Sequence, residues 1–329
     1  MHDLNGSPPA GDRPATLFDI EACYRTFLGR ECEDPLTAAA HLSDAPSLWT
    51  LIARFQASPE ARRQQIYAAS RDIYQDQDTR GVELALDANQ AAALTAQVEA
   101  VWSRYGREEA FFSVLTNPRY LSQALRDEHV EEFYATGEAE VERFLAICRR
   151  NDVEPKAAWS VLELGCGVAR MGEAFAQRFS SYAGVDISAG HLAVARDRLS
   201  ARRVGNTSLR RLSDFLAGDD GYDVFYSVIV LQHNPPPIIH KLLDIGLSRL
   251  NPGGYACFQV PCFLYDYRFE TGRYLAEEGR AETMEMHALP QRCVFELLAR
   301  HGLRPIEVAP DDRIGSIGVS YSFLARKAG

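Results

Sequence analysis

Beyond Lys156, short apolar runs alternate with amphipathic stretches, and this alternation constrains the fold more than any other feature of the chain. In order, the runs read WSVLELG, YAGVDIS, TSLRRL, YDVFYSVIVLQ and YACFQVP. Strands that alternate with helices form right-handed βαβ units. The pattern therefore predicts a parallel sheet with helices on its faces.

Two further strand candidates come last, LRPIEVAP and VSYSFLARK, joined by a turn around Ile314 to Gly318. A hairpin there would place an antiparallel strand in an otherwise parallel sheet. The expected fold class is therefore α/β. It is a Rossmann-like, doubly wound, mostly parallel sheet with a C-terminal antiparallel strand, preceded by an α-helical N-terminal region.

The first of these runs leads directly into Gly165-Cys166-Gly167, and a helical stretch follows. Glycines at a strand-to-helix turn let a ligand approach the backbone, and the N–H groups at the helix start point toward that ligand. Asp186 ends the second run, where a carboxylate can accept hydrogen bonds from both hydroxyls of a ribose. The spacing thus favours a nucleoside cofactor.

The details of the turn distinguish between two such cofactors. A dinucleotide fingerprint requires a third small residue where this chain has Arg170, and its pyrophosphate is anionic. Glu163 lies two residues before the first glycine, and its charge suits the ammonium group of S-adenosylmethionine. We therefore expect S-adenosylmethionine and not a nicotinamide dinucleotide.

The segments VLELGCGVARM, GVDIS, SDFL, YDVFYSVIVLQH and LNPGGY resemble, in order, the motifs of class I S-adenosylmethionine-dependent methyltransferases. The resemblance implies that cofactor. It assigns the methionine moiety to Glu163, Gly165 and Gly167, with Cys166 between them also a cofactor contact, the ribose to Asp186 and Ile187, the adenine to Asp214 and Phe215, and the sulfonium side to Leu231 and Gln232. Asp214 has an alternative reading as a solvated loop acid.

Composition and hydrophobic spacing along the chain indicate the domains. Residues 1–15 are expected to be a flexible tail and residues 16–75 a helical module. Residues 76–150 would hold a linker and helices that roof the cofactor site. Residues 151–329 would form the methyltransferase domain, with a substrate lid inserted at about 261–291.

Two histidines are candidate catalytic bases. Methyl transfer to an alcohol needs a base for the hydroxyl proton, whereas an amine or carboxylate acceptor needs none. His233 follows the fourth strand, at the edge where open α/β sheets bind ligands, although it could instead cap the next helix or contact the cofactor. His287 is the second candidate, with a purely structural role as its alternative.

The insert at 261–291 is rich in aromatic residues, and we expect Tyr265, Tyr267 and Arg268 to bind the acceptor. Aromatic faces beside hydrogen-bond donors suit a sugar or another polyhydroxyl compound. An insert that merely packs against the N-terminal module would have a similar composition.

Within the helical module, YRTFLGRECEDP and LIARFQASPEAR resemble phycobilisome-linker-like modules that accompany bacterial surface-glycan enzymes. The resemblance implies a protein partner or self-association through this module. A helical cap that docks on the catalytic domain is the alternative.

Charge and composition exclude several other classes. The net charge of −10 would repel a phosphate backbone, so no nucleic acid is expected as a partner. No apolar run is long enough for membrane insertion, and residues 1–15 lack the apolar segment of a signal peptide, so we expect a cytoplasmic protein. The seven cysteines have no C-x-x-C spacing, and no acid cluster suggests a metal.

The sequence therefore predicts a methyltransferase that acts on a small-molecule or glycan hydroxyl, with a sugar of surface-polysaccharide biosynthesis as the leading acceptor. A natural-product N- or O-methyltransferase is a second hypothesis. A non-catalytic binding protein that keeps the cofactor fold is the third, because one fold serves many functions.

Overall fold

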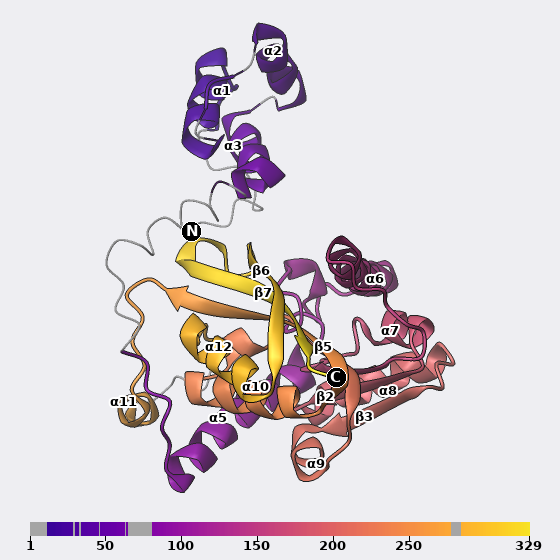
Figure 1. Ribbon diagram of the computed structural model, residues 1–329. Helices are drawn as coiled ribbons and strands as arrows, with labels where there is room; N and C mark the ends of the chain where they lie inside the picture. The colour runs from indigo at the N-terminus through magenta and orange to yellow at the C-terminus, as the bar shows by residue number, and fades with distance from the viewer. Residues whose placement is uncertain are drawn as a thin grey trace. The chain divides into compact units, whose positions relative to one another are not determined.

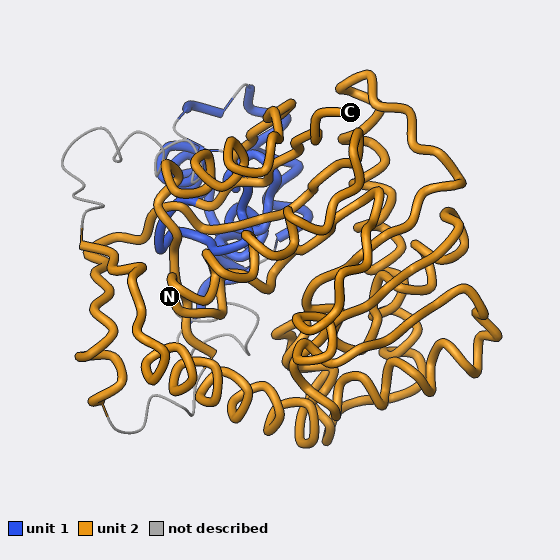
Figure 2. The backbone as a smooth tube through the Cα atoms, turned by 60° about the horizontal axis from the view of Figure 1, so that its bottom comes forward, with its two compact units in different colours: residues 1–77, 311–319 blue, residues 78–310, 320–329 orange. Residues whose placement is uncertain are grey.

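The computed structural model describes residues 12–28, 30–32, 34–45, 47–62, 64, 81–277 and 284–329. The chain divides into two compact units, coloured separately in Figure 2. Unit 1 comprises residues 1–77 and 311–319, and unit 2 comprises residues 78–310 and 320–329.

Unit 1 is helical. Its helices are α1 (Leu17–Cys23), the π-helical turn η1 (Tyr24–Leu28), α2 (Pro35–Asp44) and α3 (Leu48–Ala57), and the 3₁₀ turn η6 (Gly315–Ile317) also lies in this unit. The side chains of Thr16, Asp34 and Ser47 cap the three α-helices by accepting hydrogen bonds from first-turn N–H groups. Facing sides of the helices bury a small core that includes Ile20, Tyr24, Leu51 and Phe55.

Unit 2 begins with two long helices and continues as alternating strands and helices (Figure 1). The elements before the sheet are α5 (Ala88–Glu108), η3 (Pro118–Tyr120) and α6 (Asp127–Arg150). The alternating part contains β1 (Ser160–Leu164), α7 (Gly172–Arg178), β2 (Ser181–Asp186), α8 (Ala189–Ala201), β3 (Thr207–Arg211), α9 (Leu212–Ala217), β4 (Tyr222–Ser227), η4 (Leu231–His233) and α10 (Pro236–Ser248). The last elements are β5 (Leu250–Leu264), α11 (Thr271–Ala276), α12 (Gln291–Arg300), β6 (Leu303–Asp311) and β7 (Gly318–Lys327).

The seven strands form one sheet in the order β3-β2-β1-β4-β5-β7-β6. The first five strands pair in parallel. Gly253, near the start of β5, donates a hydrogen bond to Ala328, which follows β7, and Ala328 donates to Gly302 just before β6. The start of β5 and the start of β6 therefore both lie beside the end of β7, so β7 runs antiparallel to its two neighbours.

Helices cover both faces of this sheet. Along β1, Leu162 and Leu164 belong to the core under α5, α10 and α12, whereas Val161 belongs to the core under α6, α7 and α8. Successive side chains of a strand point to opposite faces, so the nearly continuous apolar runs of the sequence are buried on both sides. The predicted α/β fold, with its C-terminal antiparallel strand and helical N-terminal region, is confirmed.

Some sequence expectations fall partly outside the described residues: 1–11 of the predicted tail, 65–75 of the helical module and 278–283 of the predicted lid. Where the tail is described, Arg13 forms an ion pair with Asp19, and Pro14 bridges Ser47. The described part of the lid contains α11 and extended segments, because β5 continues as far as Leu264.

Glycines allow the end of α5 to lie directly against the start of α8. A Cβ on Gly190 would lie 2.5 Å from the carbonyl oxygen of Gly106, and a Cβ on Gly106 would lie 2.1 Å from the Ser188 hydroxyl. Real Cβ atoms do not approach other atoms so closely. The pair therefore positions α5 over the carboxyl edge of β1 and β2.

Helix α6 packs against the glycine turn that follows β1. Tyr134 donates a hydrogen bond to the carbonyl oxygen of Val168 at 3.1 Å, and a Cβ on Gly137 would lie 1.9 Å from the carbonyl oxygen of Arg170. The backbone of the turn and the helix are thus in direct contact, which only glycine permits at position 137.

We expect Gly137→Ala to destabilise unit 2 by about 1–3 kcal/mol, because the added methyl overlaps a backbone oxygen that cannot rotate away. At an unobstructed helical position, the same substitution would stabilise the protein, because alanine is favoured over glycine in a helix. Gly272 in α11 is such a position, since nothing lies within 4 Å of its Cβ direction, and Gly272→Ala serves as the control. Urea unfolding measures both, and a Gly137→Ala protein as stable as the control would contradict the packing argument.

Candidate functional site

The turn between β1 and α7 can be built only with glycines at two positions. Gly165 and Gly167 have φ values of +75° and +53°, in the left-handed region that side chains disfavour. A Cβ on Gly165 would lie 2.3 Å from the methyl groups of Val230, and one on Gly167 would lie 2.7 Å from Val114. The bare backbone therefore forms one wall of the space above the sheet.

Asp186 holds this turn in place. Its Oδ2 accepts a hydrogen bond from the Gly167 N–H at 2.8 Å, and its Oδ1 accepts one from the Ser188 N–H at 2.8 Å. The side chain is only 8% exposed. The carboxylate at the end of β2 thus ties the β1 turn to the start of α8, and its remaining lone pairs face the site.

Glu163 is fully buried on β1, beneath the turn. Burial raises the pKa of its carboxyl to about 8, although a hydrogen bond from the Tyr182 hydroxyl at 2.6 Å and the charge of Arg170 oppose the shift. A carboxyl at such a site is readily ionised by a cation that binds beside it. This response suits the positively charged group expected there.

A cavity of about 820 Å³, counting open space at its mouth, lies over the turn. It is lined by six of the residues predicted to bind the cofactor: Glu163, Gly165, Cys166, Gly167, Asp186 and Ile187. The carboxyl ends of β1 and β2, where these residues were predicted to lie, therefore form part of the cavity wall.

The opposite wall comes from the range 76–150, in which we expected helices to roof the site. Val98 and Trp102 of α5 line the cavity, together with Ser113 and Val114 of the loop that follows. Helix α6, in the same range, packs against the glycine turn. The position of α5 depends on the contact between Gly106 and Gly190.

The residues after β4 carry a strained backbone at the cavity. Ile229 has a φ of +61°, a conformation that is a real outlier for a β-branched residue. Its N–H donates to Gln259 Oε1 at 3.0 Å, and its neighbours Val228 and Val230 also line the cavity. Strain of this kind is usually concentrated at functional sites.

Four predicted cofactor residues do not line this cavity. Asp214 is exposed and accepts a hydrogen bond from Ser213, while Phe215 and Leu231 are buried in the apolar core. Leu212, at the start of α9, lines the cavity in their stead. The helix turns Leu212 toward the sheet edge and Asp214 away from it.

Gln232, the fourth of these residues, belongs to a buried amide chain. Its Oε1 accepts a hydrogen bond from Gln259 Nε2 at 3.1 Å, and its Nε2 lies 3.2 Å from His233 Nε2. Gln259 also donates to Ser320 of β7. The chain connects β5 and β7 to the turn after β4.

The two predicted bases, His233 and His287, lie together in a second, smaller pocket of about 330 Å³. This pocket adjoins the first, since Val98 and Trp102 line both. Its polar lining consists of Gln97, His233, Tyr274, Glu285 and His287.

His233 is neutral in this pocket. Its Nδ1 lies 2.9 Å from the carbonyl oxygen of Glu285, which can only accept, so Nδ1 carries the hydrogen and Nε2 accepts from Gln232. Burial lowers the pKa of His233 to about 4.

His287 belongs to a polar cluster within the insert. Its Nδ1 lies 2.8 Å from the Tyr267 hydroxyl and its Nε2 lies 3.3 Å from Glu285 Oε2. The same carboxylate oxygen accepts a hydrogen bond from the Tyr274 hydroxyl at 2.6 Å. The backbone N–H of His287 donates to the carbonyl oxygen of Gln232, and this bond holds the insert against the turn after β4.

The three residues predicted to bind the acceptor are placed differently from one another. Tyr267 does not line the second pocket, but its hydroxyl lies 2.8 Å from Nδ1 of His287, which does. Tyr265 packs edge-on against Phe263, and Arg268 is exposed beside Gly81, so neither lines either pocket. Tyr274 and Glu285 face the pocket in their place.

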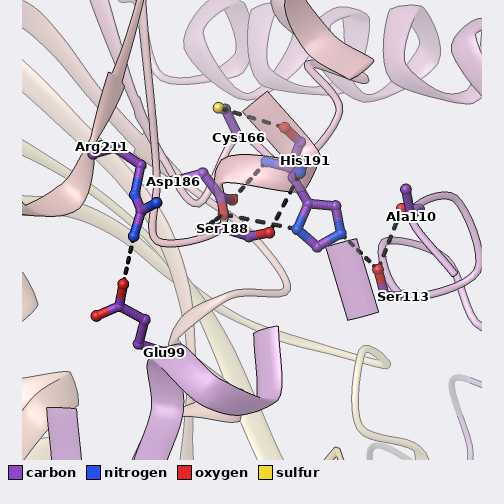
Figure 3. A network of polar contacts seen from close by, with 9 residues as sticks. Glu99, Ala110, Ser113, Cys166, Asp186, Ser188, His191 and Arg211 are labelled. Carbon is purple, nitrogen blue, oxygen red and sulfur yellow. Dashed lines mark hydrogen bonds and ion pairs between the residues drawn. The ribbon is translucent and has the colours of Figure 1, made fainter. Parts of the chain in front are cut away.

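His191 and Ser113 are the main polar residues of the first cavity that the sequence did not reveal (Figure 3). His191 is 1% exposed, its Nε2 lies 2.8 Å from the Ser113 hydroxyl, and its Nδ1 lies 3.8 Å from Asp186 Oδ1. A histidine one turn into a helix has no distinctive sequence signal. Only the fold brings it beside Asp186.

Within the described ranges, no helix combines the length and the apolar character needed to cross a bilayer. In the same part of the chain, no three histidine, cysteine or acidic side chains come together as metal ligands would.

The cavity fits S-adenosylmethionine on the observations above. It offers buried carboxyls at Glu163 and Asp186 for a cation and a diol, a bare glycine backbone, and apolar walls for a purine. The sheet order and this turn define a class I methyltransferase domain. Residues 161–254 match the family model described as a methyltransferase domain, from β1 to the start of β5. This is the domain of S-adenosylmethionine-dependent methyltransferases, and S-adenosylmethionine is its cofactor.

Among curated proteins, the chain is similar to the ubiquinone biosynthesis O-methyltransferase of Acinetobacter baylyi, with 28% identity over 107 residues. The aligned segment is 32% of this chain and 44% of that protein. The chain thus spans less than half the length of this relative.

Solved structures show weaker likeness. The magnesium protoporphyrin IX methyltransferase of Synechocystis PCC 6803 with bound S-adenosylmethionine has 15% identity and a TM-score of 0.48, over 75% of this chain and 100% of that one. An S-adenosylmethionine-dependent methyltransferase of Clostridium acetobutylicum has 14% identity and a TM-score of 0.45, over 60% and 92%.

The buried Glu163 predicts a specific pH dependence of stability. Its pKa rises from the ordinary value of 4.5 to about 8 on folding, so its contribution is complete below pH 4.5 and is lost as the pH rises through 8. Glu163→Gln keeps the acceptor for Tyr182 but cannot ionise. We therefore expect the variant to gain unfolding free energy relative to the unaltered protein between pH 5 and pH 9.

Thermal unfolding at several pH values measures this difference. Glu296→Gln, which removes an exposed carboxyl of α12, is the matched control, and its difference from the unaltered protein should not rise in the same way. A flat difference for Glu163→Gln over the same range would show that Glu163 is already ionised in the fold.

Proposed function

We propose that this protein transfers a methyl group from S-adenosylmethionine to an uncharged hydroxyl group, and that the acceptor is a sugar of a bacterial surface polysaccharide. The second pocket is the observation that supports a hydroxyl as the acceptor group, because it adjoins the cofactor cavity at Val98 and Trp102. Separate observations support a sugar as the acceptor molecule.

In this proposal, the glycine turn and Glu163 hold the methionine end of the cofactor, and Asp186 holds its ribose. The support is their common position on one cavity wall. The negative charge that Glu163 acquires beside an ammonium is compensated there, because the two charges attract strongly at a buried site.

The lining of the second pocket favours an uncharged acceptor group. Among the described residues that line it, none is an arginine or lysine, so a phosphate or carboxylate would be buried without a partner there. Imidazole, amide, hydroxyl and carboxylate groups surround the space, together with the indole of Trp102. This mixture of hydrogen-bonding groups and an aromatic face suits the hydroxyl-bearing edge of a sugar.

We propose that the pair formed by Glu285 and His287 accepts the proton of the acceptor hydroxyl. His233 has a positioning role. His233 has both ring nitrogens in hydrogen bonds, and its low pKa makes it a poor base. Glu285 lies 3.3 Å from His287 Nε2 and lines the pocket. A proton that reaches this carboxylate is shared with the imidazole.

The remaining work of the chain is positioning and exclusion of water. The cofactor supplies a methyl group already activated on a sulfonium, and the thioether leaves as that carbon is attacked. Val98 and Trp102, which line both spaces, would exclude water from the path between them.

The polysaccharide assignment rests on the resemblance of the helical module to those of surface-glycan enzymes and on the aromatic composition of the insert. Unit 1 exposes Leu17, Phe18 and Leu36, by 53%, 72% and 83% respectively. Exposed apolar side chains on a small module agree with a partner or with self-association. We place the reaction in the cytoplasm, where sugar precursors and the cofactor meet.

Incubation of the full chain with methyl-labelled S-adenosylmethionine and fractionated cell-envelope precursors tests this function. We expect label in a glycan fraction, in a base-stable linkage typical of a methyl ether. Glu285→Gln should reduce the transfer by about 10²–10⁴-fold, because the hydroxyl proton loses its acceptor.

His301→Asn is a suitable control, since His301 pairs with Asp244 outside both pockets. Label only in amine-containing small molecules, with little effect of Glu285→Gln or His233→Ala, would favour a natural-product N-methyltransferase. Label in no glycan fraction would overturn the sugar proposal and leave the fold untouched.

Asp186→Ala should weaken the binding of S-adenosylhomocysteine by about 1–3 kcal/mol, because it removes hydrogen bonds to the ribose at a buried site. Titration calorimetry measures the affinity. Equal affinity in the variant would remove Asp186 from the site. No binding to the folded, unaltered protein would favour the non-catalytic alternative.

A further inference from the structure

His191 has a buried nitrogen without a hydrogen-bond partner on the wall of the cofactor cavity. The side chain is 1% exposed and lines the cavity, and its Nδ1 has no partner among the described residues. Buried polar atoms are nearly always hydrogen-bonded, so an unpaired one at a ligand cavity indicates a group that the ligand completes.

The contacts of the ring determine which nitrogen carries the hydrogen. Ser113 has a single hydroxyl hydrogen, which it donates to the carbonyl of Ala110 at 3.2 Å. Its oxygen therefore accepts from His191 Nε2 at 2.8 Å. Burial lowers the pKa of His191, which agrees with a neutral ring. Nδ1 is then a bare acceptor.

The carboxylate that faces Nδ1 is also an acceptor. Asp186 Oδ1 lies 3.8 Å away, which is too far for a hydrogen bond even in the opposite tautomer. Asp186 already accepts from the N–H groups of Gly167 and Ser188. The site therefore presents two neighbouring acceptors, a carboxylate and an imidazole, and requires donors from outside (Figure 3).

The end of helix α5 packs closely beside this nitrogen. A Cβ on Gly106 would lie 3.1 Å from His191 Nδ1, so a side chain at that position would crowd the nitrogen. The glycine that lets α5 approach α8 therefore also keeps a side chain away from Nδ1.

We infer that His191 and Asp186 divide the two ribose hydroxyls of the cofactor between them, with His191 Nδ1 accepting from one and Asp186 from the other. A vicinal diol offers two adjacent donors, which matches a pair of adjacent acceptors. This inference rests on the proposed function, and it changes the expectation that Asp186 alone holds both hydroxyls.

Calorimetry with S-adenosylhomocysteine and its 2′-deoxy and 3′-deoxy analogues tests the inference on the full chain. His191→Met fills a similar volume, and its thioether sulfur is only a weak hydrogen-bond acceptor. We expect it to bind S-adenosylhomocysteine roughly tenfold more weakly than the unaltered protein does. The variant should bind one of the two deoxy analogues as tightly as it binds S-adenosylhomocysteine. It should still bind the other analogue more weakly.

The matched control is His301→Met, which removes a histidine near an aspartate, outside the cavity. Its affinities should equal those of the unaltered protein. If His191→Met fails to fold, ¹⁵N-histidine NMR of the unaltered protein gives the answer, because a hydroxyl that binds Nδ1 moves its resonance when S-adenosylhomocysteine is added.

Unchanged affinity and unchanged discrimination in His191→Met, or a resonance that does not move, would overturn the inference while leaving the proposed function intact. Failure of the unaltered protein to bind S-adenosylhomocysteine would overturn both.

Discussion

The hydrogen bond from the Gly167 N–H to Asp186 Oδ2 is the interaction on which the site depends. It joins the turn after β1 to the end of β2, and the other oxygen of the same carboxylate holds the start of α8. Because the side chain is buried, these hydrogen bonds are shielded from water and fix the wall of the cavity.

A second constraint is the helix that closes the cavity. Helix α5 reaches the carboxyl edge of the sheet because Gly106 and Gly190 allow its end to touch α8. Its residues Val98 and Trp102 then separate two spaces of different character. The larger has buried carboxyls and apolar walls, and the smaller holds imidazole, carboxylate and phenol groups. In the proposed function, the cofactor takes the larger space and the acceptor the smaller one.

Six of the residues predicted to bind the cofactor line one cavity, whereas the residues predicted to bind the acceptor are scattered. Gly165, Gly167 and Asp186 lie at strand ends, and strand ends of a parallel sheet meet at one edge whatever the remainder of the chain does. His233 and His287 do share a pocket, although nothing in their spacing shows it. Asp214 faces solvent because one turn of α9 points Leu212 inward in its place.

By itself, the sequence determined the α/β fold and the glycine turn, because hydrophobic periodicity and left-handed glycine positions are local properties. Tertiary structure decided which distant side chains meet there. The proximity of His191 to Ser113, the roof formed by α5 and the cluster around Glu285 all join residues from separate segments. Such contacts depend on how helices pack, and no local pattern encodes that packing.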